Sequence, residues 1–431
     1  MKRGVIAVRS ALVLGFGLAA HAASAADDGA YLFGDWGGAR TRFADAGVTF
    51  DFGYVSEAAH NFTGGTDQLT RYTDQWKLGA TLDLEKLVRW QNATFQIYIT
   101  DRNGRNLGAD AGIGNNQLIQ EVYGRGQTWH LTIFALDQRW LDGVIDWSIG
   151  RLPVGADIAS FSCDFQNLTF CGAQPGNIVG DYWVNWPTSQ WATRLKVKTS
   201  AQTSVQIAAY QLNPDYVDDD YARHNGLTLD NPGTKGWLLP LEFGWTPKWN
   251  GLPGSYKTGV WYNTAGGSDL FDDVNHTPRA LTGDAPLQRD SRYGAYVTLQ
   301  QQLTGTAGGE GWVAFFNAAK ADAETSSTDR QIALGGEYYQ PFGRIHDFIG
   351  VAVGATHANG RLADYQRLYN ATHPDDAKLV RDGDEYVCEV FYSFAPLPSI
   401  QIRPNLQYIH NPGGTDLHDA FVVGLKTVIA F

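Results

Sequence analysis

Apolar and polar residues alternate along most of this chain, and the alternation is clearest at its C-terminal end. Phe421, Val423, Leu425 and Phe431 share one parity, whereas Lys426 lies on the other. Successive side chains of a β-strand point to opposite faces, so one face of such a strand suits lipid while the other meets a different environment. An open sheet edge cannot remain unpaired in lipid, so this segment predicts a strand of a closed transmembrane barrel.

Sixteen segments with this period of two predict the strands of the barrel. Their ranges are 48–60, 72–84, 93–101, 129–138, 144–151, 191–198, 204–212, 237–246, 256–264, 292–302, 311–319, 330–339, 347–357, 385–395, 400–409 and 419–431. Bacterial outer-membrane barrels have an even number of strands, and a barrel of this size encloses water. The expected fold is therefore all-β: a 16-stranded antiparallel transmembrane β-barrel over residues 48–431, with no separate domain.

Short and long connections alternate between these segments. Short ones span 139–143, 199–203 and 396–399, and long ones span 102–128, 152–190, 213–236, 265–291 and 358–384. Short periplasmic turns and long outer loops are typical of an up-and-down barrel, whereas a soluble β-sandwich lacks this rhythm. Tryptophans near strand ends predict aromatic girdles at the two membrane interfaces; they are Trp76, Trp140, Trp191, Trp245, Trp249 and Trp261.

The first 25 residues have the features of a secretory signal peptide. Lys2, Arg3 and Arg9 accompany an apolar run over 11–20, and Ala-Ser-Ala at 23–25 fits a cleavage site. The apolar run is shorter than the ~20 residues that a helical span needs, which disfavours a membrane anchor. In the following segment, 26–47, the stretch 35–47 predicts a short helix with Asp35 as its cap and Gly47 as its stop.

The charge and hydropathy of the chain narrow its surroundings. The net charge is −12, and without the signal 30 basic residues face 45 acidic ones, a net charge of −15. So acidic a chain is not expected to bind nucleic acid. The mean hydropathy is −0.27, as expected of strands that alternate and average out as polar. The expected location is the outer membrane of a Gram-negative cell, in contact with its lipid and lipopolysaccharide.

The cysteines and the short motifs of the sequence do not indicate catalysis or metal binding. In the oxidising envelope that a signal implies, Cys163 and Cys171 are expected to form a disulfide and Cys388 to stay free. The sequence has no C-x-x-C or paired-histidine spacing for zinc. H-E-x-x-H, G-x-S-x-G and P-loop motifs are also missing, so we expect neither an enzyme nor a cofactor.

Several blocks of sequence resemble the carbohydrate-selective porins, the OprB family. They are GDWGGARTRFADAG at 34–47, followed by VTFD; GRLPVGAD at 150–157; CDFQNLTFCG at 163–172; and WPTSQW at 186–191. The resemblance implies a sixteen-stranded outer-membrane channel for monosaccharides such as glucose, working by facilitated diffusion. Many sixteen-stranded porins are homotrimers, so a homotrimer is one expectation. A general diffusion porin and a saccharide-binding surface barrel that does not transport are the alternatives.

The longest connection, 152–190, is expected to fold inward and narrow the lumen, as porins generally do at this position. Sugars present hydroxyl groups and apolar C–H faces, which aromatic rings, amides and arginines recognise. The expected substrate-binding residues at the constriction are Arg102, Glu121, Arg151, Phe165, Asn167, Trp183, Trp186, Arg194 and Lys196. The alternative is that the loop side chains anchor it to the barrel wall and that the charges are solvated.

Overall fold

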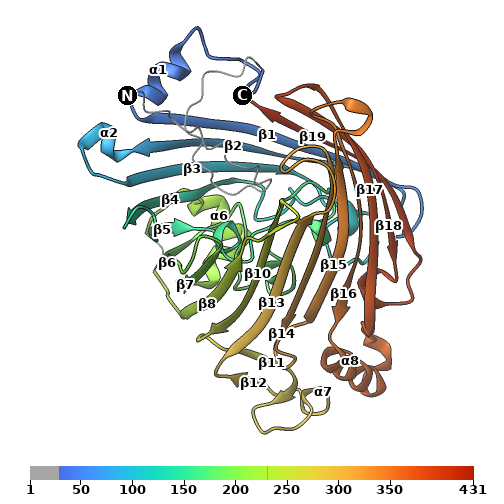
Figure 1. The fold of residues 1–431 in the computed structure, drawn as a ribbon. Helices are drawn as coiled ribbons and strands as arrows, with labels where there is room; N and C mark the ends of the chain where they lie inside the picture. Colours follow the sequence, from blue (N-terminus) through green and yellow to red (C-terminus); the bar gives the residue numbers. More distant parts are fainter. Residues whose placement is uncertain (1–28, 231) are drawn as a thin grey trace, which may run out of the picture.

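The structure, a computed structural model, describes residues 29–230 and 232–431. The predicted signal peptide at 1–25 lies outside this part of the chain. The described residues form an antiparallel barrel that closes where β1 pairs with β19 (Figure 1). Each long strand pairs with its neighbours in chain order, and the two-residue β9 adds to one end of β10.

The sixteen long strands coincide with the sixteen predicted segments, which confirms the predicted barrel. They are β1 Val48–Asn61, β2 Thr70–Asp83, β3 Ala93–Gly104, β4 Trp129–Trp140, β5 Ile145–Leu152, β6 Gln190–Lys198, β7 Thr203–Leu212, β8 Gly236–Trp245, β10 Leu252–Asn263, β13 Arg292–Gln302, β14 Gly311–Ala321, β15 Thr328–Tyr339, β16 Phe348–Ala358, β17 Gly383–Leu397, β18 Ile400–His410 and β19 Ala420–Ala430. The largest shift is in β10, which begins at Leu252 rather than at 256.

Alternation sorts side chains between the outer and inner faces of the wall. On β19, Val423 and Leu425 are exposed on the outer face, whereas Val422 and Lys426 are buried on the inner face. The other strands alternate in the same way, so the apolar outer face of the barrel meets lipid and the polar inner face lines the lumen.

The tryptophan prediction needs correction. Trp140 and Trp249 are exposed at strand ends, as an interfacial girdle requires, whereas Trp76 is exposed in the middle of β2, where its ring stacks on Phe431. Trp261 is only 2% exposed, because it lies on the inward parity of β10 and donates from Nε1 to the Tyr182 hydroxyl at 2.9 Å. It belongs to the packing inside the barrel and not to a girdle.

The helices are short and lie between the strands. They are α1 Ala39–Asp45, α2 Leu84–Val88, α3 Leu107–Asp110, α4 Val154–Asp157, α5 Gln174–Ile178, α6 Asp219–Asn225, α7 Arg279–Thr282 and α8 Gly360–Thr372, with 3₁₀ turns η1 Leu168–Phe170, η2 Pro214–Val217, η3 Pro341–Gly343, η4 Pro374–Asp376 and η5 Pro412–Gly414. Within 29–230 and 232–431, no helix is both long enough and apolar enough to cross a bilayer.

The predicted N-terminal helix is present as α1. Its N-cap residue is Gly38 rather than Asp35, yet Asp35 accepts a hydrogen bond from the Thr41 backbone at 2.8 Å and so serves the first turn. Gly47 follows with φ +99°, a left-handed conformation that suits glycine and stops the helix.

The two rims of the barrel differ. α1 lies at the same rim as the end of β19, where the Leu32 backbone donates to Ala430 O at 2.8 Å (Figure 1). The opposite rim carries the long connections with α7 and α8. One of these contains a hairpin that the sequence pattern did not predict, β11 Gly267–Asp273 with β12 Pro286–Arg289. Its strands are too short to show a clear period.

Candidate functional site

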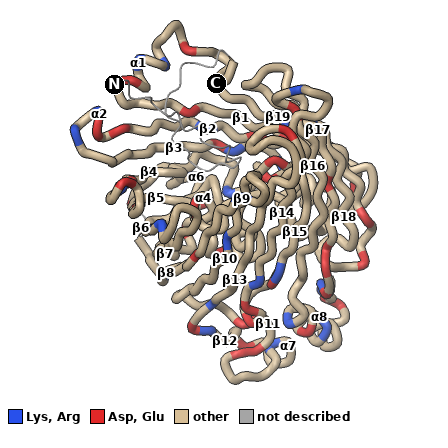
Figure 2. Tube along the Cα trace, in the orientation of Figure 1, with Lys and Arg blue, Asp and Glu red and all other residues tan. Residues whose placement is uncertain are grey.

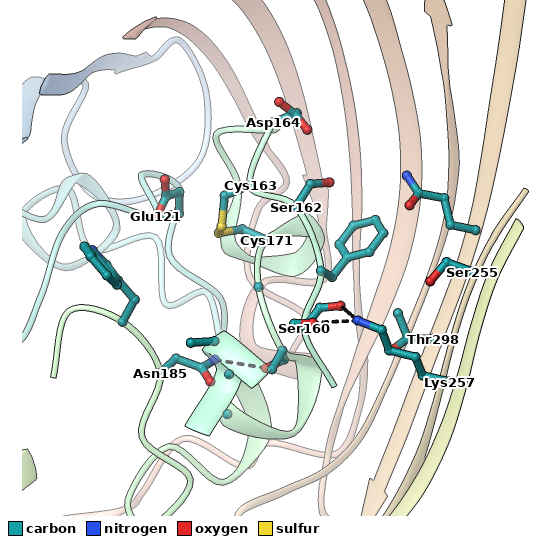
Figure 3. Close-up of a pocket in the computed structure, with 18 of the residues that line it drawn as sticks. Glu121, Ser160, Ser162, Cys163, Asp164, Cys171, Asn185, Ser255, Lys257 and Thr298 are labelled. Atoms are coloured by element: carbon teal, nitrogen blue, oxygen red, sulfur yellow. Dashed lines mark hydrogen bonds between the residues drawn. A yellow bond between two sulfur atoms is a disulfide. The ribbon is translucent and has the colours of Figure 1, made fainter. Parts of the chain in front are cut away.

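A cavity of about 950 Å³ occupies the lumen between the barrel wall and two inward-folded loops. The loop at 153–189 follows β5, as predicted, and a second loop at 105–128 follows β3. Ser160, Ser162 and Asp164 line the cavity from the first loop, whereas Lys257 and Thr298 face them from β10 and β13 (Figure 3). The loops and this wall therefore enclose the cavity from opposite sides.

Glutamates on the inner wall hold the inward loops through backbone N–H groups. Glu389 on β17 accepts from the backbones of Gln166 and Asn167, both at 2.8 Å. Glu242 on β8 accepts from the Ala159 backbone at 2.7 Å. Loop backbone inside a barrel lacks strand partners, and these carboxylates supply the missing acceptors.

The second inward loop is held in the same way. Glu385, also on β17, accepts from the backbones of Asn116 at 2.6 Å and Gln117 at 3.2 Å, and from Gly413 at 2.8 Å. Glu57 on β1 accepts from the Val122 backbone at 3.2 Å. The wall thus fixes both loops at several points far apart in the sequence.

A compact ion network joins the wall to the loops. Lys426 on β19 lies 3.1 Å from Glu57 and 2.9 Å from Glu121, and it also donates to the carbonyls of Cys163 and Phe165. Lys426 and Glu57 are at most 2% exposed, and Glu121 is 9% exposed. Because each charge has an opposite charge or a hydrogen-bond partner, the network can be buried without an unpaired ion.

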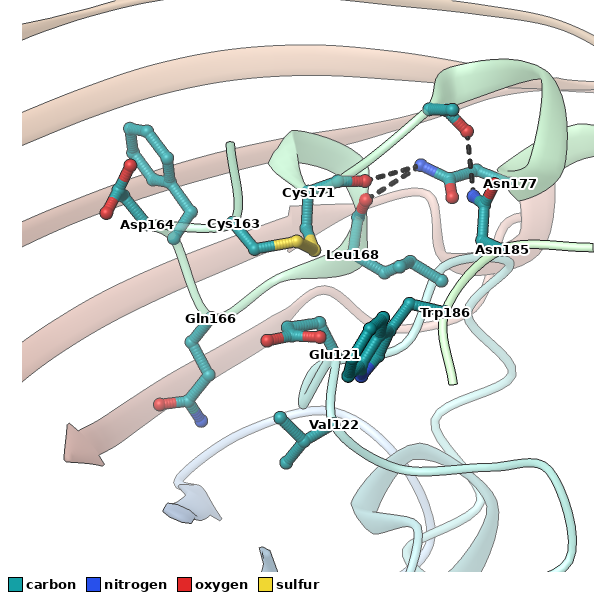
Figure 4. Close-up of a disulfide and its surroundings, with 12 residues drawn as sticks. Glu121, Val122, Cys163, Asp164, Gln166, Leu168, Cys171, Asn177, Asn185 and Trp186 are labelled. Carbon is teal, nitrogen blue, oxygen red and sulfur yellow. Dashed lines mark hydrogen bonds between the residues drawn. A yellow bond between two sulfur atoms is a disulfide. The ribbon is translucent and has the colours of Figure 1, made fainter. Parts of the chain in front are cut away.

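A disulfide between Cys163 and Cys171 lies at the edge of the cavity, and Cys388 is free. The sulfurs face Glu121, whose carboxylate lies within 4.8 Å of both (Figure 4). Asn177 donates to the carbonyls of Leu168 and Cys171, which ties the disulfide segment to α5. Sulfurs bonded to each other offer no thiolate, so this group is not suited to a metal ion.

Asn185 fits tightly between two glycines of the same loop. Its side chain donates to Ala173 O at 3.0 Å. A Cβ atom at either Gly155 or Gly176 would collide with the Asn185 side chain. These positions require glycine because the loop folds back closely on itself beside the cavity.

Three of the predicted site residues line the cavity: Arg102, Glu121 and Trp186. Gln75 on β2 connects two of them, because its Oε1 accepts from Arg102 Nε at 2.9 Å and from Trp186 Nε1 at 3.0 Å. Arg102 Nη2 also lies 3.8 Å from the Glu121 carboxylate. The tertiary structure therefore brings a cation, an anion, an amide and an indole ring to one wall.

Phe165, Asn167 and Trp183 are not placed to touch a solute, which corrects the prediction for these three. Each is at most 1% exposed. Phe165 packs against aromatic rings of the wall, and the Asn167 side chain donates to Gln407 at 2.9 Å. The Trp183 ring packs edge-on against Trp261, 5.3 Å between centroids. They anchor the loop to the wall, as the alternative stated.

Arg151, Arg194 and Lys196 also lie outside the cavity lining. Arg151 donates to the carbonyls of Ser189 at 2.9 Å and Thr228 at 3.1 Å. Arg194 is 6% exposed and pairs with Asp146 at 2.7 Å. Lys196 is partly buried on the inward face of β6. The side chains of Arg151 and Arg194 are thus held by the protein and are not placed for the predicted contact, whereas the predicted contact of Lys196 stays a prediction.

Other groups that line the cavity were not predicted from the sequence, among them Ser160, Asp164, Lys257 and Arg403. Arg403 on β18 donates to Asp164 O at 2.8 Å and lies 3.2 Å from the Asp164 carboxylate. Lys257 and Arg403 stand on the inward parity of predicted strands, so the alternation contained a signal for them. The loop residues had no such signal.

Tyr182 shows the electrostatic effect of the packed loop. Burial raises the pKa of its hydroxyl well above the usual value, although the nearby Arg292 guanidinium and the hydrogen bond from Trp261 act in the opposite direction. The hydroxyl therefore stays neutral and accepts the Trp261 indole hydrogen bond under ordinary conditions.

Comparisons with known proteins agree with this geometry. The profile of the family described as carbohydrate-selective porin, OprB family, matches residues 67–431. The N-terminal block at 34–47 lies outside that match. Porin B of Pseudomonas aeruginosa is 41% identical over 437 residues, which cover 97% of this chain and 95% of that protein. The putative porin QuiX of Acinetobacter baylyi is 33% identical, with 94% of each chain covered.

Among solved structures, the high-pH structure of Pseudomonas putida OprB superimposes with a TM-score of 0.91 at 41% identity, covering 95% of this chain and all of that one. This chain therefore belongs to the carbohydrate-selective porins of the OprB family, and it is a sugar channel of the Gram-negative outer membrane.

Proposed function

We propose that the sugars carried are monosaccharides such as glucose, which cross the lumen into the periplasm by passive, facilitated diffusion. Passage through an open cavity requires no chemical step, so the chain has no catalytic role in this proposal. Binding must stay weak because a conducting pore has to release its solute. A millimolar dissociation constant corresponds to about −4 kcal/mol, which one ring contact and a few hydrogen bonds can supply.

The observation that carries the proposal is the wall formed by Trp186, Gln75, Arg102 and Glu121. The indole offers a flat apolar surface to the C–H face of a pyranose ring. The Gln75 amide holds this ring and the Arg102 guanidinium in fixed positions, and the Glu121 carboxylate lines the same polar wall. The entry of a neutral solute costs little free energy, because these charged and polar groups are already paired with one another.

A test uses single-channel conductance in a planar bilayer, titrated with glucose. We expect saturable block at millimolar glucose, and Trp186→Ala should raise the half-blocking concentration by about tenfold, since a sugar–aromatic contact of about 1.4 kcal/mol is lost. Trp249→Ala is the matched control, because Trp249 is exposed at a short turn.

The alternatives give different traces. Conductance that glucose does not disturb would indicate a general diffusion pore, and no conductance would indicate a saccharide-binding barrel that does not transport. Equal losses of glucose block and ion flow in Trp186→Ala would mean that the ring shapes the pore without recognising sugar.

We also propose a homotrimer, on the basis of the resemblance alone. Native mass spectrometry of the detergent-purified protein tests it. A mass three times that of one chain would support the trimer, and a single-chain mass at the same detergent concentration would contradict it.

A further inference from the structure

The lining of the lumen cavity has a charge opposite to that of the chain. The chain carries a net charge of −12, yet six of the residues that line the cavity are Lys or Arg and only three are Asp or Glu. A cavity with low-dielectric walls and an excess of one charge concentrates solutes of the other sign. The cations that lack an acidic partner are the ones that carry this excess.

Three of the six lining cations, Arg102, Arg403 and Lys426, have an acidic partner within 4 Å. Lys426 is paired with Glu57 and Glu121, and Arg403 is paired with Asp164. Lys257 differs, because its Nζ donates only to the Ser160 carbonyl at 2.8 Å and to the Ser160 hydroxyl at 2.5 Å. Across 29–230 and 232–431, Lys257 forms no ion pair.

The charged groups packed around Lys257 come from neighbouring elements and are occupied elsewhere. Glu242 on β8 accepts from the Ala159 backbone and from Tyr296, both at 2.7 Å. Asp157 in α4 lies 3.5 Å from Arg194. Lys196 on β6 adds positive charge to the same region. The ammonium group of Lys257 is therefore available to an incoming anion.

Neutral hydrogen-bonding groups surround this ammonium. Thr298 on β13 is the cross-strand partner of Lys257, and Ser255 is the partner of Gln300, so all four side chains share the inner face. All four line the cavity, and Ser160 faces them from the inward loop (Figure 3). Hydroxyl and amide groups can both donate and accept, which suits a solute that carries many hydroxyls.

We propose that Lys257 makes this channel favour polyhydroxy monocarboxylates, the sugar-acid class, over neutral sugars of the same size. The carboxylate of the solute accepts from Lys257 Nζ, and its hydroxyls exchange hydrogen bonds with Ser255, Thr298 and Gln300. This inference rests on the proposed function in one respect, that sugar-sized solutes enter the lumen. The single charge gives a preference that remains weak enough for release.

The test compares sodium gluconate with glucose as blockers of the same channel at low KCl. We expect half-block by gluconate at a concentration about fivefold lower than for glucose, because a hydrogen bond to a charged group is worth roughly 1 kcal/mol more than a neutral one. Lys257→Gln, which keeps a donor for Ser160, should abolish the preference, so that gluconate and glucose half-block the channel at the same concentration.

Lys248→Gln is the matched control, since Lys248 is another lining lysine but is exposed on the two-residue β9. It should keep the gluconate preference. Glucose block without a gluconate preference, or a preference that survives Lys257→Gln, would overturn this inference and leave the sugar channel intact. Block by neither solute would overturn both proposals.

Discussion

The carboxylate of Glu389 accepts backbone hydrogen bonds that a neighbouring strand accepts elsewhere in the barrel. It accepts from two successive backbone N–H groups of the inward loop, at Gln166 and Asn167, and it is fully buried. Without it these donors would be left unpaired inside the protein, which costs about 1–3 kcal/mol for each group. One wall side chain therefore fixes the position of the loop beside the disulfide.

Glu389→Ala is expected to loosen the loop and not the barrel. We predict noisier single-channel currents and glucose block weakened by about tenfold, since roughly 1.4 kcal/mol of ordering is lost at the constriction. Glu389→Gln keeps one oxygen acceptor, so its current noise and its glucose block should lie between those of wild type and Glu389→Ala. Glu310→Ala, at an exposed position before β14, is the control. Wild-type noise and block in Glu389→Ala would show that the loop does not depend on this carboxylate.

At the outer rim, α8 is fastened to the β11–β12 hairpin by charge. Arg361 of α8 donates to Asp269 at 2.8 and 3.0 Å and to Asp272 at 2.7 Å, and Arg289 of β12 reaches Asp269 as well. Figure 2 shows basic and acidic residues interspersed over these elements. Burial alone would raise the pKa of Asp269, but hydrogen bonds from the Asp272 and Phe271 backbones and from both arginines lower it to about 2.

This contact should therefore depend on pH in a defined direction. A carboxyl group with a lowered pKa contributes stability that is complete above the usual pKa of 3.8 and is lost as the pH falls through about 2.

We predict that Arg361→Ala speeds hydrogen exchange in α8 and residues 267–273 severalfold at pH 7, with glucose block unchanged. Arg367→Ala, which removes the exposed ion pairs with Asp364 and Asp382, should leave exchange in residues 267–273 unchanged. Equal exchange rates in the two variants would show that the ion pairs of Arg361 with Asp269 and Asp272 do not hold α8 to the hairpin.

The barrel as a closed structure depends on the seam between its first and last strands. Glu57 of β1 and Lys426 of β19 are direct cross-strand partners, and Glu121 of an inward loop completes their network. The seam and the loop are thus joined by the same buried charges. Removing one member of a buried ion pair is more damaging than replacing both, because an uncompensated charge remains.

Lys426→Met should lower the free energy of unfolding by about 3–5 kcal/mol, because Glu57 and Glu121 lose their shared cation. Urea unfolding in lipid vesicles, followed by tryptophan fluorescence, measures this. Glu57→Gln combined with Lys426→Met should recover part of the loss, and the exposed Lys198→Met should change stability by less than about 0.5 kcal/mol. A Lys426→Met barrel as stable as wild type would rule out the seam network as a source of stability.

Local alternation was enough to predict the strands, because the parity of a strand is a property of consecutive residues. It placed Lys426 and Leu425 on opposite faces and located all sixteen long strands without any knowledge of their partners. The same signal marked Lys257 and Arg403 as inward, although it did not single them out. The cysteine spacing favoured the pairing that the structure contains.

Which inward side chains meet the solute was decided only by the tertiary structure, because the path of a loop depends on partners far along the chain. Trp183 and Trp186 are three residues apart and chemically alike, yet one packs against Trp261 of the wall and the other lines the cavity. Asn167 is held by Glu389, and no local pattern connects two positions separated by 222 residues. The sequence therefore specifies the barrel and its two faces, whereas long-range contacts with the wall determine the binding surface.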